Sequence, residues 1–294
     1  FSHVDVPLVS TFILSSKVGK EAYVEPIVEG NSYRFTVKFG KPPAQAEEGT
    51  KVGRGGHFGC LMSASPIHVN YIREQGKLGL MGQRMLAIVA DGVKGRVYLT
   101  PPIQHEALAD EITPTWKPDI LINHNPRDIR TQLYGLTKYS DLFTSRQLVA
   151  LTTFSDLVQE SIVKCRLDAI AQGMADDGIS LDAGGRSATA YAQAVGVYLS
   201  LALSRLTDIC NALCRWEVTK TQVRNLFGRQ AIPMMWDFAE NNVFGESAGD
   251  YAVSLGNLLR ALNELPTIGQ SVAFHSDAQT QTISTNKVIS TDPP

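Results

Sequence analysis

Residues 145–174 read SRQLVALTTFSDLVQESIVKCRLDAIAQGM and decide the fold class, because their apolar residues recur at the spacing of one helical face. Thr144 or Ser145 can cap the N-terminus of this helix, and Gly173 lies near its end. The chain before Asp141 lacks this periodicity. We therefore expect a long helix that separates a β-rich N-terminal part from a helical part.

The first 100 residues have the pattern of short strands, rich in β-branched and aromatic residues and separated by Gly, Lys and Asn. The predicted strands are VSTFILSS (9–16), AYVEPIVEG (22–30), SYRFTVKFG (32–40), MLAIVAD (85–91) and GRVYLTP (95–101). Residues 101–140 are rich in proline and aperiodic, which predicts a long connection.

Further helices are expected after the first one. The spacing predicts helices from about Ser187 to Trp216, from Lys220 to Phe227 and within SAGDYAVSLGNLLRALNEL (247–265). The last 25 residues differ, because SVAFHSDA (271–278) and KVISTDPP (287–294) have the pattern of short apolar strands with acidic residues near their ends. Strands of a Rossmann-like sheet present polar groups in this way.

Composition excludes several classes of protein. With 44% hydrophobic and 19% charged residues, the chain fits neither a disordered nor a collagen-like class. The 27 Lys and Arg against 29 Asp and Glu give a net charge of −2, so any nucleic-acid surface must be a local patch. Arg205 and Asp208 interrupt the most apolar stretch, which indicates a buried helix and no membrane span. The four cysteines have no paired spacing, and the cytoplasm is the expected compartment.

The terminal residues Thr291, Asp292, Pro293 and Pro294 form the most informative motif. Two prolines after a carboxylate fix an extended backbone and remove two donors, which leaves Asp292 and carbonyl oxygens free to accept hydrogens from an amine. An ordinary exit from a strand into a loop explains the same residues equally well.

This motif resembles the start of the Asp-Pro-Pro-Tyr motif of methyltransferases that modify adenine N6 in DNA. The wider chain looks like the prokaryotic family of adenine-specific DNA methylases that carry a zinc ribbon. The resemblance spans nearly the whole chain and rests on residues 52–60, 65–67, 82–99, 123–158, 213–244, 271–281 and 288–294.

The resemblance implies an α+β chain taken from a Rossmann methyltransferase that uses S-adenosylmethionine, with its glycine-rich cofactor motif upstream of Phe1. It implies four parts: a degenerate ribbon (1–100), a proline-rich connection (101–140), a helical insertion for target recognition (141–265) and the last core strands (266–294). We take the chain to be a piece of a longer protein. The expected partners are DNA and other subunits of a defence system, with no membrane.

The same resemblance assigns roles to single residues. Asp277 would accept hydrogens from the adenine amine of the cofactor, although a turn residue without a ligand explains it as well. The segment ISLDAGGRSATAYA (179–192) looks like a cofactor loop, but we expect it to join two helices. Asp292 and the carbonyl of Pro293 would hold the target amine, with Pro294 completing the motif.

The zinc ribbon implied by the resemblance is incomplete. Cys60 is followed by Leu, Met and Ser63 where the family has a second cysteine, and no cysteine precedes Val6-Pro7-Leu8. A structural zinc needs four thiolate or imidazole ligands, and Cys60 with His57 or His3 supplies too few. We expect a metal-free remnant.

Two further segments carry candidate residues. Asp237 and Glu240 are three residues apart, which predicts one helical face beside the active site, where either packing or a substrate contact is possible. Arg127, Arg130 and Tyr134 have a spacing suited to phosphates and a stacked base. A solvated loop with salt bridges accounts for these three equally well.

The sequence therefore predicts part of a DNA adenine N6-methyltransferase. The alternative is a non-catalytic nucleic-acid-binding module in a prokaryotic defence or repair assembly that keeps a methyltransferase skeleton. A third interpretation is that the chain is a purely structural zinc-ribbon adaptor. The missing cysteines disfavour it.

Overall fold

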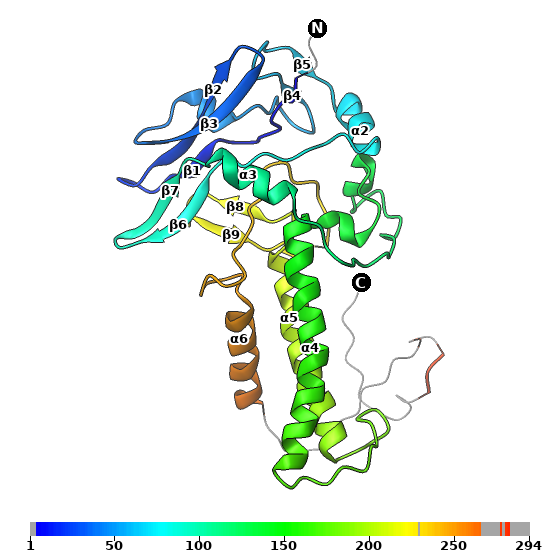
Figure 1. Ribbon diagram of the computed structural model, residues 1–294. Coiled ribbons are helices and arrows are strands. Elements are labelled where there is room, and N and C mark those ends of the chain that lie inside the picture. The colour runs from blue at the N-terminus through cyan, green and yellow to red at the C-terminus, as the bar shows by residue number, and fades with distance from the viewer. Residues whose placement is uncertain (1–3, 229, 266–276, 278–279, 283–294) are drawn as a thin grey trace. The chain divides into compact units, whose positions relative to one another are not determined.

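The computed structural model describes residues 4–228, 230–265, 277 and 280–282. The chain divides into two compact units, residues 1–258 and 259–294, and each is considered by itself. Unit 1 mixes α and β structure, as expected (Figure 1). The predicted strands at 271–278 and 287–294 lie outside the described residues, except for Asp277.

The described strands of unit 1 pair antiparallel. They are β1 (Ile13–Ser15), β2 (Ala22–Glu29), β3 (Ser32–Phe39), β4 (Phe58–Gly59), β5 (Pro66–Ile67), β6 (Ile88–Gly92), β7 (Gly95–Leu99), β8 (Arg215–Glu217) and β9 (Gln222–Arg224). The predicted meander is confirmed as the sheet β1-β2-β3, and the predicted pair near residue 90 is confirmed as the hairpin β6-β7.

The meander buries one face because its apolar residues alternate along the strands. Val24, Tyr33 and Phe35 point into a core that also holds Val9 and Phe12. This core excludes water from one face of the sheet β1-β2-β3.

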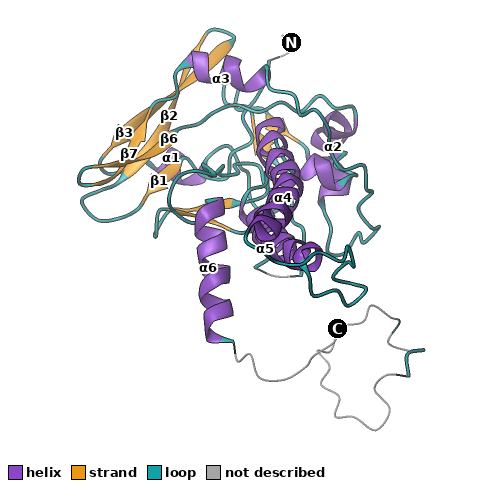
Figure 2. Cartoon of the chain, turned by 60° about the horizontal axis from the view of Figure 1, so that its bottom comes forward, coloured by secondary structure: helices purple, strands orange, loops and turns teal. Residues whose placement is uncertain are grey.

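The hairpin β6-β7 lies beside β3, as Figure 2 shows. Tyr98 packs with Ala22 and Val37 in one buried cluster, and the backbone N–H of Val37 donates to Thr100 Oγ1 at 3.0 Å. Trp216 of β8 packs on the same cluster, so three separate hairpins share this core.

The described helices are α1 (Ala44–Glu48), α2 (Val69–Lys77), α3 (Ile103–Asp110), α4 (Ser145–Ala171), α5 (Ala188–Ile209), α6 (Tyr251–Glu264) and the 3₁₀ helices η1 (Thr131–Tyr134) and η2 (Tyr139–Leu142). Helix α4 confirms the periodicity that begins at Ser145. Its N-terminus is fixed by a capping box, in which Thr144 accepts from the Gln147 N–H and Gln147 accepts from the Thr144 N–H.

Helix α5 packs along α4 through small residues. A Cβ on Gly196 would lie 2.5 Å from Ile162 Cδ1, and Ala192 is fully buried. Nearer their junction with the β-rich part, Leu151 and Leu206 share one core cluster. Two backbones can approach closely only where one helix presents such small side chains.

Helix α5 ends at Ile209, seven residues before the predicted end at Trp216. The buried Asn211 explains this difference. Its amide donates to the carbonyls of Thr207 and Asp208, and its Oδ1 accepts from the N–H of Leu213. This side chain therefore satisfies the last carbonyls of the helix and turns the chain.

The predicted helix from Lys220 to Phe227 is wrong. These residues enter the hairpin β8-β9, in which Trp216 faces Val223 and Thr221 has a φ of +54°. The indole Nε1 of Trp216 donates to the carbonyl of Leu14 at 2.7 Å, and this tertiary contact outweighs local helical preference.

Two further predictions also need correction. The connection 101–140 contains α3, which begins directly after Pro102, because a proline at the start of a helix removes no intrahelical bond. Residues 231–244, in which Asp237 and Glu240 were expected on one helical face, form an irregular loop. No described helix is long and apolar enough to cross a membrane.

Helix α2 packs against η1 through two glycines. Gly135 has a φ of +87°, and a Cβ there would lie 2.5 Å from the carbonyl oxygen of Gly76. In turn, a Cβ on Gly76 would lie 2.5 Å from the carbonyl oxygen of Tyr134. Neither position has room for a side chain.

We expect Gly135→Ala to lower the free energy of unfolding by about 3 kcal/mol, because left-handed strain and a backbone clash add. The matched control is Gly173→Ala, where φ is +90° but no atom lies within 4 Å of the new Cβ. The control should cost only the strain, about 1 kcal/mol. Urea unfolding of both variants measures the difference, and equal losses would contradict the packing contact.

Candidate functional site

Tyr134, expected to stack on a base, is buried in unit 1. Its ring lies edge-to-face with Trp236, with centroids 4.8 Å apart, and packs in one cluster with Phe58 and Ile72. The guanidinium of Arg73 lies over the ring, 5.7 Å from its centroid. In this structure Tyr134 is 6% exposed, so its ring is a core element and offers no open face to a base.

The backbone around Tyr134 is shaped by glycine. A Cβ on Gly56 would lie 2.9 Å from the Tyr134 hydroxyl and 3.0 Å from Val69 Cγ2. The glycine-rich segment before Phe58 therefore passes directly over this aromatic cluster. The absence of a side chain at Gly56 lets this segment pack closely against Tyr134 and Val69.

Arg127 and Arg130, by contrast, are exposed. The backbone N–H of Arg130 donates to the carbonyl of Ile232, and its Nε donates to the carbonyl of Arg127 at 3.3 Å. No ion pair joins either guanidinium to a carboxylate among the residues that the structure describes. Both side chains are available to an anionic partner, and Tyr134 is not.

Asp237 and Glu240 act at separate places. Asp237 accepts from the backbone N–H of Ser10 at 3.1 Å, which ties the loop to the start of the meander. Glu240 pairs with Arg146 of α4 through two contacts, at 2.9 and 3.0 Å. This neighbour raises the pKa of Arg146 above its ordinary value. The two carboxylates thus hold the loop in place and form no shared ligand pair.

Cys60 begins the turn between β4 and β5. Its N–H donates to the carbonyl of Ser65, and its carbonyl accepts from the N–H of Ala64. The Ser63 hydroxyl lowers the pKa of the Cys60 thiol, and the backbone N–H groups of Met62 and Ser63 act in the same direction. The turn therefore favours a thiolate at Cys60, as a metal-binding knuckle would.

Histidines near this turn do not complete a metal site. His57 and His68 lie edge-to-face with ring centroids 4.8 Å apart, and His68 Nδ1 accepts from the N–H of Asn70. Across the described part of the chain, no group of three or more His, Cys, Asp or Glu residues is placed to hold a metal ion. His3 lies outside that part.

The segment 179–192 joins α4 to α5, as expected, and is not a strand-to-helix loop. Asp176 accepts from the N–H and the hydroxyl of Thr189, in the first turn of α5, and pairs with Arg166 at 2.5 Å. The Thr189 hydroxyl and Arg166 hold the pKa of Asp176 far below its ordinary value. These contacts cap α5 and lock the connection.

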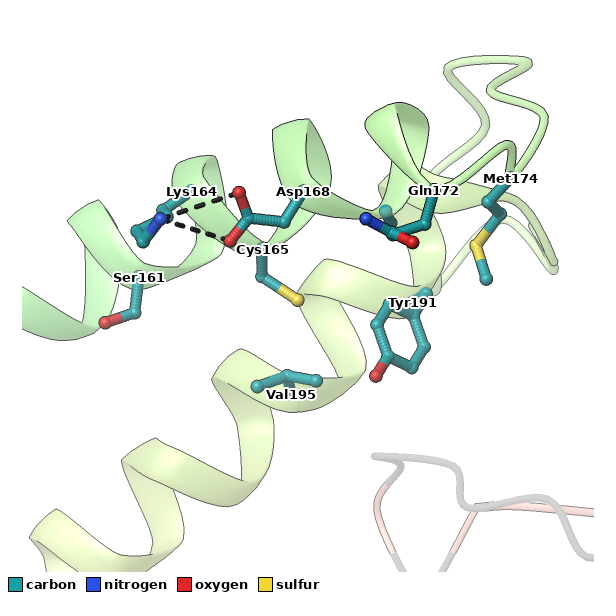
Figure 3. Close-up of a pocket in the computed structure, with 9 residues that line it drawn as sticks. Ser161, Lys164, Cys165, Asp168, Gln172, Met174, Tyr191 and Val195 are labelled. Atoms are coloured by element: carbon teal, nitrogen blue, oxygen red, sulfur yellow. Dashed lines mark hydrogen bonds and ion pairs between the residues drawn. The ribbon is translucent and has the colours of Figure 1, made fainter.

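An open groove of about 570 Å³ lies between α4 and α5 near this connection. Figure 3 shows Cys165 and Tyr191 on its facing walls, with the Lys164–Asp168 ion pair along one side. None of the described residues that were predicted to bind DNA or cofactor lines it. The groove follows from the pairing of the two helices.

Asp277 is exposed, and its carbonyl accepts from the N–H groups of Thr280 and Gln281. It therefore begins a turn, which is compatible with either interpretation of this residue. Asp292, Pro293 and Pro294 lie outside the described residues.

A cluster that the sequence analysis missed lies where three hairpin turns meet. The turn before β2 carries Lys17 and Lys20, the β6-β7 turn carries Lys94 and is followed by Arg96 in β7, and the β8-β9 turn carries Lys220. We call these five exposed residues the basic edge. The available signal was the lysine-bearing turns themselves, KVGK, VKGR and VTKT, but nothing local showed that they converge.

Comparisons with known proteins add no family. A scan against protein-family models, a search of curated proteins and a search of solved structures each found no match to this chain.

We expect the purified chain to hold no stoichiometric zinc, because a structural site needs four thiolate or imidazole ligands and the Cys60 turn supplies one thiolate. Metal analysis after dialysis against a mild chelator provides the test. One retained zinc per chain would show that histidines, His57 and His68 first among them, have replaced the missing cysteines.

We also expect Ser63→Ala to raise the pKa of Cys60 and so slow its alkylation at neutral pH, because the thiolate is the nucleophile. The measurement is the pH dependence of iodoacetamide labelling in a Cys165→Ser background. Cys210 and Cys214 should stay silent, since burial raises their pKa values to about 12 and about 11. An unchanged labelling profile would mean that the hydroxyl does not stabilise the thiolate.

Proposed function

We propose that this chain is part of an S-adenosylmethionine-dependent DNA methyltransferase that modifies adenine N6. The observation that carries the proposal is the terminal motif Thr291 to Pro294, together with the long segments that resemble the zinc-ribbon family of adenine-specific methylases. The chemistry of that motif suits an amine, because a carboxylate and proline-fixed carbonyls can only accept hydrogens.

The described residues support the DNA-binding side of this proposal. Arg127 and Arg130 are exposed and have no ion pair with a described carboxylate, so they can contact phosphates without first breaking a salt bridge. The backbone N–H of Arg130 donates to the carbonyl of Ile232, which fixes the main chain at this position and limits the backbone entropy lost on binding. Both arginines lie in the proline-rich connection (101–140), which in sequence directly precedes the helical insertion (141–265) that the resemblance assigns to target recognition.

In the proposed reaction, Asp292 and the carbonyl of Pro293 hold the exocyclic amine and orient its lone pair. S-adenosylmethionine supplies the methyl group when bound. The target base leaves the duplex stack first, because the amine is otherwise inaccessible. Methyl transfer to an amine depends mainly on positioning and electrostatics, so no strong base is required of this chain.

Among the described residues, Asp277 is the one that was predicted to contact the cofactor. Asp277 is exposed and begins a turn. A carboxylate is a suitable acceptor for the adenine amine of S-adenosylmethionine. The remaining contacts would come from the glycine-rich motif expected before Phe1.

The second candidate is a non-catalytic nucleic-acid-binding module in a defence or repair assembly. The exposed, unpaired arginines favour it as much as they favour the enzyme. The two candidates separate at Asp292, which only the enzyme needs.

In the full-length protein, we expect Asp292→Ala to reduce methyl transfer to adenine by about 10²–10³-fold, the order of loss seen on removing one preorganised hydrogen-bonding group. Duplex affinity should stay nearly unchanged, because phosphate contacts supply most of it. Transfer of a radiolabelled methyl group and equilibrium binding to the same duplex measure the two effects.

The matched control is Glu160→Ala, which removes an exposed carboxylate in the middle of α4. It should change neither rate nor affinity. Near-normal methylation by Asp292→Ala would contradict the catalytic role of Asp292. A complete lack of methylation by the unmodified protein would favour the binding module.

A further inference from the structure

The basic edge concentrates positive charge on a chain whose net charge is −2. Lys17, Lys20, Lys94, Arg96 and Lys220 are all exposed, and among the described residues none of them forms an ion pair. Elsewhere in unit 1 cations of this kind often have partners, such as Arg84 with Glu106 and Arg146 with Glu240. The edge therefore presents uncompensated charge to the solvent.

Backbone carbonyls hold these charges together. Lys20 Nζ donates to the carbonyl of Lys94 at 3.4 Å, which joins the turn before β2 to the β6-β7 turn. Lys17 Nζ donates to the carbonyl of Lys220 at 3.2 Å and to Thr221 Oγ1 at 2.9 Å, which joins it to the β8-β9 turn. The first turn thus bridges the other two.

Further contacts fix the three turns as one surface. The N–H of Ser16 donates to the carbonyl of Val218 at 3.2 Å. The guanidinium of Arg96 lies 5.7 Å from the ring centroid of Trp216. Trp216 itself donates a hydrogen bond to the carbonyl of Leu14. The turns that carry the cations are therefore held in place before any ligand binds.

Acidic residues near the edge offset only part of this charge. Glu217 is neutralised by Arg224 at 2.7 Å, whereas Asp91 faces Arg96 across the β6-β7 hairpin and Glu21 follows Lys20 in sequence. The five cations of the edge therefore outnumber these two carboxylates. Like charges within a Debye length of about 8–10 Å repel one another. A polyanion that crosses all three turns would remove this unfavourable repulsion between the cations.

The tips of two turns also expose apolar side chains beside the cations. Val18 is 96% exposed between Lys17 and Lys20, and Val93, beside Lys94, is fully exposed. A branched apolar side chain at a turn flanked by lysines suits the sugar surface of a groove with phosphates on each side. An anionic lipid surface offers the same two chemistries.

We infer that the basic edge binds the phosphate backbone of duplex DNA, with the three turns laid along one groove. The choice of a nucleic acid over a lipid surface rests on the proposed function. The inference goes beyond that function because it assigns the contact to residues of the β-rich part, whereas the resemblance assigned target recognition to the helical part.

The test compares binding of the full chain to a fluorescent mixed-sequence duplex of two helical turns over a range of salt. We expect Lys20→Gln, Lys94→Gln and Lys220→Gln together to weaken binding on the order of 10²-fold near 0.1 M salt. The slope of log affinity against log salt should fall by about 2–3, since each lost phosphate contact contributes about 0.9. Arginine at the same three positions should keep both values.

The matched control removes three charges elsewhere in unit 1, with Arg54→Gln, Lys77→Gln and Lys117→Gln. These residues are exposed and have no ion pair among the described residues. Circular dichroism checks the fold of each variant. If the triple edge variant does not fold, the pair Lys94→Gln and Lys220→Gln, whose side chains donate no hydrogen bond in the described structure, should still lower the slope by about 2.

Several results would overturn the inference. Equal losses in the edge and control variants would show a general charge effect. Full binding by the edge variant, with loss in Arg127→Gln and Arg130→Gln, would move the contact to those arginines and leave the proposed function standing. No duplex binding by the unmodified chain, or edge-dependent binding only to vesicles of phosphatidylserine and phosphatidylcholine, would overturn the inference and the DNA-binding side of the proposed function together.

Discussion

The packing of the partly buried Trp216 is the contact on which the arrangement of the β-rich part depends. Its indole N–H donates to the carbonyl of Leu14, and its ring packs on the cluster of Ala22, Val37 and Tyr98. A two-stranded hairpin is at best marginally stable alone in water, so the hairpins β6-β7 and β8-β9 need this shared core. The same contact brings their turns together, and with them the cations that a polyanion would meet.

Long-range polar contacts then fix the irregular segments that connect the hairpins and helices. Arg146 on α4 holds Glu240, and Asp237 reaches back to the N–H of Ser10. Tyr134, Trp236 and Phe58 close the aromatic cluster between these segments. Side chains that the sequence offered as candidate ligands are therefore used to fasten loops, which leaves the exposed arginines and lysines as the groups open to a partner.

The turn at Cys60 is closed by backbone hydrogen bonds to Ser65 and Ala64 and lowers the pKa of the Cys60 thiol. Backbone N–H groups and the Ser63 hydroxyl stabilise negative charge on the sulfur, as they would for a bound thiolate. The hairpin β4-β5 and the core residue Phe58 support the shape of this turn through packing.

The sequence by itself determined the elements whose signal is local. Apolar spacing and the Thr144 cap define α4, and alternation defines β2, β3, β6 and β7, because these patterns depend on residues within a few positions of one another. Only the tertiary structure decided the hairpin at Trp216, the burial of Tyr134 and the convergence of the basic edge. Each of these depends on partners far along the chain, such as Leu14 for Trp216 and Lys94 for Lys20, and no local pattern encodes such pairings.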